Sequence, residues 1–194
     1  MTESIVKTLK MPNEIQVDLK DSDYLTLKGP KGTISKKFKT HRVTLSVKGN
    51  SILVEGHPKN KQTDVLVETI VSHIKNMAEG LIAGYKYDLK VVYSHFPMAI
   101  QVDKENVNIK NFLGEKFPRK AKIFGATKVE IKGQDITVSG NNKEDVGQTA
   151  SNLERKTKVR NKDIRRYQDG IYIVATGNID AHKGKFVEVI RGRE

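Results

Sequence analysis

The two halves of the chain repeat one pattern of apolar residues and glycines, and this repeat limits the possible folds more than any other feature. Residues 47–56 read VKGNSILVEG, and residues 131–140, 84 positions later, read IKGQDITVSG. Apolar positions alternate with period two on either side of a tight, glycine-containing turn, which predicts a β-hairpin in each half. The chain is therefore expected to hold two copies of one small unit.

The segments that flank the two hairpins also correspond. LTLKGPKG at residues 25–32 matches VNIKNFLG at residues 107–114, with a two-residue slip in a loop. After the first hairpin, apolar residues at helical spacing predict a helix over about residues 63–80 that Asp64 caps and that Gly80 and Gly84 end. After the second hairpin, Asn142 precedes a less apolar helix that runs through Leu153.

A closing strand follows each helix, at residues 85–92 and 171–175. Several strands followed by one helix form an α+β pattern. The sequence therefore predicts two tandem duplicated domains, each a small, mostly antiparallel sheet with one long helix packed on one face. We expect the first domain at residues 1–92 and the second, with a C-terminal tail, at residues 93–194, and Pro97 marks a hinge between them.

The charge of the chain indicates its class of partner. Thirty-five Lys and Arg stand against 23 Asp and Glu, which gives a formal net charge of +12. Such a protein repels itself unless a polyanion is near, so nucleic acid or an anionic membrane is the expected partner. Nucleic acid is favoured, because no basic amphipathic helix with a broad apolar face and no apolar run of about 20 residues is found. The absence of cysteine fits a reducing compartment.

Basic residues gather in two clusters of the second copy, with further cations in the tail at positions 183, 185, 191 and 193. The first basic cluster surrounds residues 111–114 and consists of Lys110, Lys116, Arg119, Lys120 and Lys122. The second basic cluster follows the second helix and consists of Arg155, Lys156, Lys158, Arg160, Lys162, Arg165 and Arg166. Runs of one sign suit phosphate contacts, whereas a surface that only confers solubility usually mixes both signs. Gly114 and Gly170 would let the backbone approach an RNA strand, and a merely solvated surface is the alternative.

Aromatic residues are too few for a typical single-strand binder, at 6% of the chain with no tryptophan. Phe112, Phe117, Phe124 and Tyr167 are candidate stacking residues, but the alternation places most of them in the core. We therefore expect recognition of folded RNA by its shape.

Catalytic and metal-binding signatures are not found. The sequence has no glycine-rich phosphate loop before a helix and no HExxH motif, and its five histidines are scattered. We expect no enzyme, no catalytic residue, no cofactor and no metal. Two alternatives stay open: a protein-interaction module whose basic face binds an acidic partner, and an enzyme whose site is assembled from distant residues.

Several motifs resemble, in order, those of the ribosomal protein L6 family, which is called L9 in the eukaryotic cytosolic ribosome. The resemblance covers about residues 13–176 and is closer to the archaeal than to the eukaryotic branch. The first dozen residues match weakly, and the tail from residue 176 does not align. The motifs that carry it are SHIKNM at 72–77, VYSHFP at 92–97, NFLGEK at 111–116, GQDI at 133–136, KEDVGQTA at 143–150 and QDGIY at 168–172.

The resemblance implies a structural constituent of the large ribosomal subunit in the cytoplasm. Such a protein binds large-subunit rRNA near the sarcin–ricin loop and the stalk base, contacts neighbouring ribosomal proteins and indirectly supports translation GTPase factors. Neither a membrane nor a homo-oligomer is expected. The family relation adds to the charge argument at eight positions: Lys110, Lys116, Arg119, Lys120, Lys162, Arg165, Arg166 and Gly170. Charge and position add the other expected rRNA-binding residues, which are Asn111, Gly114, Lys122, Lys156, Lys158 and Arg160.

Overall fold

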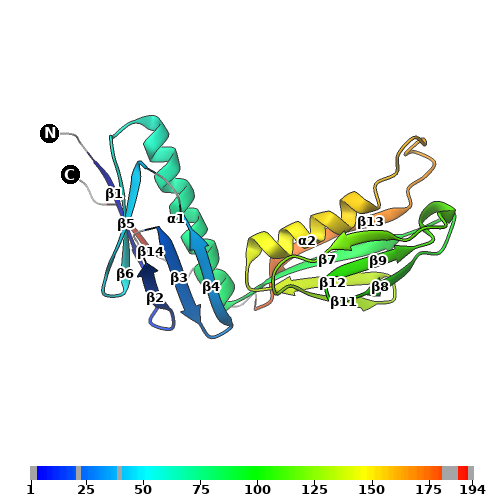
Figure 1. Ribbon diagram of the computed structural model, residues 1–194, viewed down its shortest axis with the longest axis horizontal. Helices are drawn as coiled ribbons and strands as arrows, with labels where there is room; N and C mark the ends of the chain where they lie inside the picture. Colours follow the sequence, from blue (N-terminus) through cyan, green and yellow to red (C-terminus); the bar gives the residue numbers. More distant parts are fainter. Residues whose placement is uncertain (1–3, 21–22, 39–40, 181–187, 192–194) are drawn as a thin grey trace. The chain divides into compact units, whose positions relative to one another are not determined.

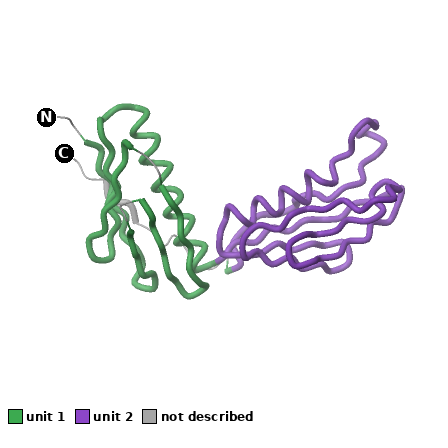
Figure 2. The backbone as a smooth tube through the Cα atoms, in the orientation of Figure 1, with its two compact units in different colours: residues 1–83, 180–194 green, residues 84–179 purple. Residues whose placement is uncertain are grey.

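The computed structural model describes residues 4–20, 23–38, 41–180 and 188–191, the last of these by their backbone alone (Figure 1). The chain divides into two compact units (Figure 2). Unit 1 consists of residues 1–83 and 180–194, and unit 2 consists of residues 84–179. Unit 1 is thus discontinuous in the sequence, whereas unit 2 is one continuous segment.

Unit 1 is built from two antiparallel sheets and one helix. One sheet has the order β14-β1-β6-β5 and the other β2-β3-β4. Helix α1 packs against strands of both sheets. The elements are β1 (Ile5–Lys10), β2 (Gln16–Lys20), β3 (Tyr24–Gly29), β4 (Gly32–Lys37), β5 (Val43–Lys48), β6 (Ser51–Gly56), α1 (Lys61–Ile82) and β14 (Glu188–Arg191).

Unit 2 repeats this architecture. Its sheets have the orders β11-β12-β7-β13 and β10-β9-β8, and helix α2 packs on strands of both. The elements are β7 (Tyr85–Val92), β8 (Ala99–Val102), β9 (Asn106–Lys110), the 3-10 turn η1 (Phe112–Gly114), β10 (Arg119–Lys122), β11 (Lys128–Lys132), β12 (Asp135–Gly140), α2 (Lys143–Lys156) and β13 (Gly170–Asn178).

The predicted α+β fold with a duplicated unit is confirmed, but each unit has two sheets where one was expected. Both predicted hairpins form, as β5–β6 and β11–β12. Gly49 and Gly133 open their two-residue turns with φ of 59° and 63°, a left-handed conformation that favours glycine. The two sheets arise because a helix with a broad apolar face can cover more strands than the hairpin alone supplies.

The first helix begins and ends differently from the prediction. Asn60, rather than Asp64, caps it, and the Asn60 side chain accepts a hydrogen bond of 2.8 Å from the Thr63 backbone N–H. The helix continues through Gly80 to Ile82, because the last turn buries Leu81 and Ile82 in the core of unit 1 and this packing outweighs the low helix propensity of glycine. The second helix begins directly after Asn142, as predicted, and the Asn142 side chain caps it by accepting a hydrogen bond of 3.1 Å from the Glu144 N–H.

The boundary between the units also differs from the expected 92/93 division. β7 was expected to close the first domain, yet it pairs with β12 and β13 in the middle of a unit 2 sheet. In unit 1 the corresponding place belongs to β1, which pairs with β6 and β14. The matching pairs are Leu9 with Ile52 and Leu89 with Ile136. The segment with Pro97 accordingly lies within unit 2 and is no hinge between domains.

Each unit has its own hydrophobic core. In unit 1 the buried face of α1, with Val67, Ile70 and Ile74, packs on sheet residues such as Leu9 and Ile52. In unit 2 Val146, Ala150 and Leu153 of α2 play this part. No helix within the described ranges is both long and apolar enough to cross a membrane.

Candidate nucleic-acid interface

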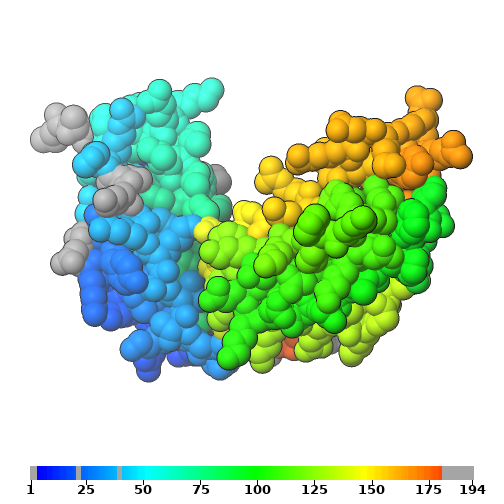
Figure 3. Space-filling model, turned by 45° about the vertical axis from the view of Figure 1, so that its right-hand side comes forward, coloured from blue at the N-terminus to red at the C-terminus, as the bar shows by residue number. Residues whose placement is uncertain are grey.

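The two basic clusters belong to loops of unit 2 that lie at the same end of its sheets (Figures 1 and 3). The first basic cluster flanks η1, between β9 and β10. The second basic cluster begins in the last turn of α2 and continues through the loop that leads to β13. This loop, orange in Figure 3, projects from unit 2.

A buried aromatic ring and three left-handed residues fix the loop after β9. Phe112 is 1% exposed and anchors the loop in the core of unit 2. Asn111, Leu113 and Gly114 have φ of 60°, 50° and 77°. The Asn111 side chain donates a hydrogen bond of 3.0 Å to the Pro97 carbonyl. The basic side chains on either side of η1 therefore project from a backbone of defined shape.

Arg119 joins the first basic cluster to the second. Its Nε and Nη2 atoms donate to the two carboxylate oxygens of Glu115 at 2.8 and 2.5 Å, and its Nη1 donates to the Lys156 carbonyl at the end of α2 at 2.7 Å. The guanidinium carbon also lies 4.2 Å from the centre of the Phe112 ring. The hydrogen bond from Arg119 holds the pKa of Glu115 below its usual value. The charge of Arg119 is thus engaged within the protein.

Thr157 anchors the start of the loop that follows α2. This buried residue ends the helix, and its hydroxyl contacts the Leu153 and Glu154 carbonyls, each at 3.2 Å. The same oxygen accepts a hydrogen bond of 2.9 Å from the Ile171 N–H in β13. The end of α2 and the start of β13 are therefore held together below the loop.

Asp169 anchors the end of the same loop, directly before β13. Its side chain is 1% exposed, and its Oδ1 atom accepts hydrogen bonds from the backbone N–H groups of Ser94 at 2.7 Å and His95 at 3.1 Å. Its Oδ2 atom lies 2.7 Å from Nδ1 of His95. Burial alone would raise the pKa of Asp169, but the hydrogen bonds from His95 and Ser94 outweigh it, so the pKa is lowered.

An aromatic stack extends from this carboxylate toward the surface. The His95 ring lies on the Tyr167 ring, with centroids 4.5 Å apart and planes at 25°. The Lys162 ammonium lies 4.6 Å from the centre of the Tyr167 ring. His95 and Asp169 stand 74 positions apart. Both fall inside the motifs that carried the family resemblance, but only the fold reveals them as a pair.

Most of the expected rRNA-binding residues are exposed, and two are not. Arg119 is half-buried and engaged as described, and Gly170 is buried. A Cβ on Gly170 would come within 3.2 Å of the Tyr172 ring, so this glycine supports a side chain instead of lying open to a strand of RNA. The exposed residues are Lys110, Asn111, Gly114, Lys116, Lys120, Lys122, Lys156, Lys158, Arg160, Lys162, Arg165 and Arg166. Of the tail cations, positions 183, 185 and 193 and the side chain of Arg191 lie outside what the structure describes.

The aromatic candidates differ in exposure. Phe112 is in the core as expected, whereas Phe117 is 85% exposed and Phe124 is 36% exposed. Phe117 lies in the loop between η1 and β10, where the period-two alternation of a strand does not apply. An exposed phenylalanine between Lys116 and Arg119 can stack on a base of a bound RNA.

Within the described part of the chain, no group of three or more histidine, aspartate or glutamate side chains could hold a metal ion. The side chains at this end of unit 2 can neutralise negative charge, form hydrogen bonds and stack.

Comparisons with known proteins agree with this arrangement. A family model described as ribosomal protein L6 matches residues 11–92 and again residues 96–170. The large ribosomal subunit protein uL6 of Methanosarcina mazei is 44% identical over 174 residues, which cover 90% of this chain and 98% of that protein. The protein of the same name from Staphylothermus marinus is 46% identical over 177 residues, which cover 89% of this chain and 95% of that protein. That from Haloarcula marismortui is 39% identical over 170 residues, covering 88% and 95%. These relatives are archaeal, and the chain belongs to the ribosomal protein L6 family.

Proposed function

We propose that this protein is a non-catalytic structural constituent of the large ribosomal subunit, which binds large-subunit rRNA through unit 2. The observation that carries the proposal is the joining of two basic clusters at one end of unit 2 by the Arg119 contact to the Lys156 carbonyl. The names of the relatives, large ribosomal subunit protein uL6, support the ribosomal assignment.

The exposed lysines and arginines act by neutralising phosphates. Each contact releases counterions, which supplies affinity without reading sequence. Because Asp169, Thr157 and Arg119 fix the two loops before binding, little conformational entropy is lost when RNA is bound. Arg119 and Gly170 position the other residues, and the remaining twelve expected residues make the contacts.

The family relation supports a finer location. We place the site near the sarcin–ricin loop and the stalk base, in cytoplasmic ribosomes, beside neighbouring ribosomal proteins. The protein there holds a local rRNA tertiary arrangement and supports the docking of translation GTPase factors indirectly, without turnover.

The test is a salt series of binding to an rRNA fragment that carries the sarcin–ricin region, against a size-matched control RNA. The logarithm of the affinity should fall with the logarithm of the salt concentration by about 0.7–0.9 per phosphate contact, and the sarcin–ricin fragment should bind more tightly. A response to salt that is flat, with no preference between the fragments, contradicts the proposal.

A charge-reversal pair of variants locates the surface. Lys116, Lys120, Arg165 and Arg166 changed together to Glu should abolish incorporation into large subunits. The matched control changes four exposed lysines of unit 1 in the same way: Lys10, Lys28, Lys37 and Lys48. Equal incorporation of both variants would show that the surface is wrongly assigned. Association with ribosomal particles that survives digestion of RNA by nuclease would favour an acidic protein partner instead.

A further inference from the structure

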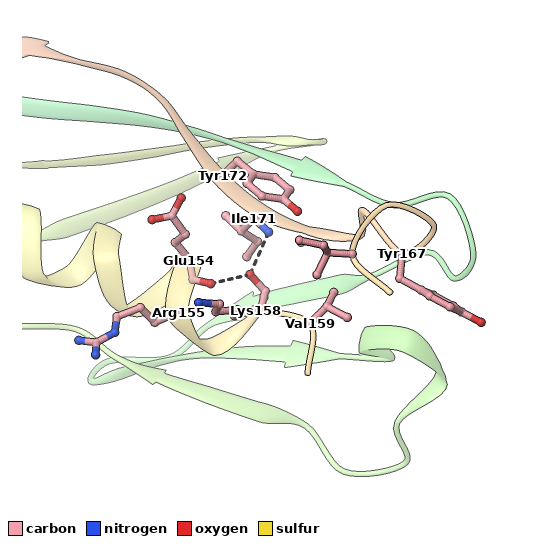
Figure 4. Close-up of a pocket in the computed structure, with 10 residues that line it drawn as sticks. Glu154, Arg155, Lys158, Val159, Tyr167, Ile171 and Tyr172 are labelled. Atoms are coloured by element: carbon pink, nitrogen blue, oxygen red, sulfur yellow. Dashed lines mark hydrogen bonds between the residues drawn. The ribbon is translucent and has the colours of Figure 1, made fainter. Parts of the chain in front are cut away.

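A pocket of about 380 Å³ lies between the end of α2, the loop that follows it and the start of β13 (Figure 4). In Figure 4 the Tyr172 ring and Ile171 lie on one side and Val159 on the other, and the Tyr167 side chain extends away to the right. Ile164 also lines the pocket and is 69% exposed. The volume is at the lower end of the range of about 300–1,000 Å³ in which small organic groups bind.

The Tyr172 ring is held in a fixed position beside this pocket. Its hydroxyl donates a hydrogen bond of 3.1 Å to the Gln168 carbonyl. The ring packs closely on the backbone at Gly170, where an added Cβ would lie 3.2 Å from it and would push it by a few tenths of an ångström. The side chain nevertheless stays 44% exposed. A rigid, partly exposed aromatic ring is a platform on which a flat ring system can stack.

Charges around the pocket are segregated. The Glu154 carboxylate lies on the same side of the pocket as Tyr172 in this view, while the Arg155 guanidinium points away from it (Figure 4). Lys158 also lines the pocket, and Lys156 and Arg160 lie next to these cations in the sequence. The side chains of Glu154, Arg155 and Lys158 make no hydrogen bond or ion pair with any residue in the described ranges. A carboxylate repels phosphate but accepts hydrogen bonds from the amino groups of bases.

We propose that this pocket receives one unpaired base of the bound RNA, stacked on Tyr172, with its flanking phosphates on Arg155 and Lys158. The inference rests on the rRNA-binding function proposed above and adds a base-binding site to a surface otherwise built for phosphates. A base with an exocyclic amino group suits the pocket best, because Glu154 accepts its hydrogen bond. Gly170 then serves binding by leaving room for the Tyr172 ring.

The experiment measures affinity for the sarcin–ricin rRNA fragment over a salt series, with the full chain and a Tyr172→Ala variant. Loss of one stacked base should weaken binding roughly 5- to 150-fold. The salt slope should stay at the wild-type value, because no phosphate contact is lost. Lys158→Ala should instead lower the slope by about 0.7–0.9.

Two variants serve as controls. Tyr172→Phe keeps the ring and should bind within a few-fold of the wild type. Tyr24→Ala removes a tyrosine of unit 1 that is also 40% exposed and also hydrogen bonded through its hydroxyl, and it should leave affinity unchanged. Thermal unfolding of each variant shows whether it is folded. Independently of any variant, ultraviolet cross-linking of the wild type to the fragment, read by mass spectrometry, should mark Tyr172.

The outcomes separate this inference from the proposed function. If the wild type binds the fragment no better than a control RNA, the proposed function fails. If it binds specifically but Tyr172→Ala binds equally well, the base pocket alone is wrong, and an apolar side chain of a protein is then the better occupant. A folded Tyr172→Ala variant with a reduced salt slope, or cross-links that never include Tyr172, would also overturn the inference.

Discussion

At the scale of single residues, the most consequential side chain of unit 2 is a buried carboxylate and not a lysine. Asp169 lies at the end of the loop between α2 and β13, which carries most of the second basic cluster. Its contacts with Ser94 and His95 hold this loop against the turn that follows β7. In the proposed interface each exposed cation adds one phosphate contact, whereas Asp169 fixes the end of this loop. Its importance follows from its burial. If the carboxylate were lost, water could not easily reach the groups that it bonds, and their hydrogen bonds would stay unmade.

Asp169→Asn should lower the free energy of unfolding by about 1–3 kcal/mol, because it removes a charge that receives buried hydrogen bonds. Urea denaturation measures this value. The matched control is Asp135→Asn in the same unit, whose exposed side chain should cost less than about 0.5 kcal/mol. Equal effects of the two changes would contradict the assigned role.

The same carboxylate predicts a pH dependence. Because the pKa of Asp169 is lower in the folded protein than its unfolded value of about 3.9, its stabilisation is complete above that value and is lost as the pH falls through the folded pKa. The difference in Tm between wild type and Asp169→Asn should thus be constant above about pH 5 and shrink below about pH 4. If the difference in Tm grew as the pH was lowered, the pKa of Asp169 would be raised, and not lowered, in the folded protein.

At the scale of elements, the proposed interface consists of two loops that are held by α2. The end of α2 offers one carbonyl to Arg119 and one hydroxyl, on Thr157, to β13. The loop with η1 and the loop after α2 therefore share one support. This arrangement separates the residues that we propose to contact RNA from the residues that hold the loops.

Arg119→Ala should affect the stability of the fold, whereas Lys116→Ala should affect RNA binding. Loss of Arg119 breaks its hydrogen bonds to Glu115 and Lys156 and should lower the free energy of unfolding by about 1–3 kcal/mol. Loss of the exposed Lys116 should leave Tm unchanged and reduce the salt slope of rRNA binding by about 0.7–0.9. Denaturation curves and the salt series, measured on both variants, decide the matter. A stable Arg119→Ala variant that loses only salt slope would make Arg119 an RNA contact after all.

At the scale of the whole molecule, the sequence repeat and the folded unit are offset by one strand. The family model matches residues 11–92 and 96–170, so the first match ends with β7 and the second ends at Gly170, where β13 begins. In space the first of these strands, β7, belongs to unit 2, and unit 1 is completed by β14 from the other end of the chain. Each core is then closed by a strand from outside its own repeat.

Fragments cut at the two kinds of boundary should behave differently. Residues 84–179 contain all the strands of unit 2 and should unfold cooperatively when expressed alone. Residues 93–194 lack β7, which pairs with both β12 and β13, and should not fold. Thermal unfolding followed by circular dichroism distinguishes them. Cooperative unfolding of the 93–194 fragment would show that the sequence repeat is the folding unit.

The net charge of +12 predicts the response of the free protein to salt. Screening of repulsion among like charges should raise Tm as NaCl increases from about 0.01 to 0.15 M, where the Debye length falls from about 30 to 8 Å. Differential scanning calorimetry measures this shift. The variant with Lys116, Lys120, Arg165 and Arg166 changed to Glu has a formal net charge lower by eight and should show a smaller rise in Tm. A Tm of the wild type that fell with salt would oppose this account.

The sequence alone determined the α+β class, the duplication, the hairpins at 47–56 and 131–140 and the start of the second helix after Asn142. These features depend on local patterns: period-two alternation, helical spacing and a glycine with positive φ. It also determined the family and indicated the two basic clusters, since charge can be read without a fold.

Only the tertiary structure decided which segments meet. The pairing of β7 with β13, the contact of Asp169 with His95 and the bridge from Arg119 to Lys156 join residues that are 37 to 93 positions apart. No local pattern encodes such a contact, because its partners are chosen by the packing of each core and by the need to satisfy buried polar groups. For the same reason the sequence placed the cap of α1 at Asp64 and not at Asn60. It also gave no sign that Arg119 is bonded to Glu115 and Lys156 or that Gly170 is buried.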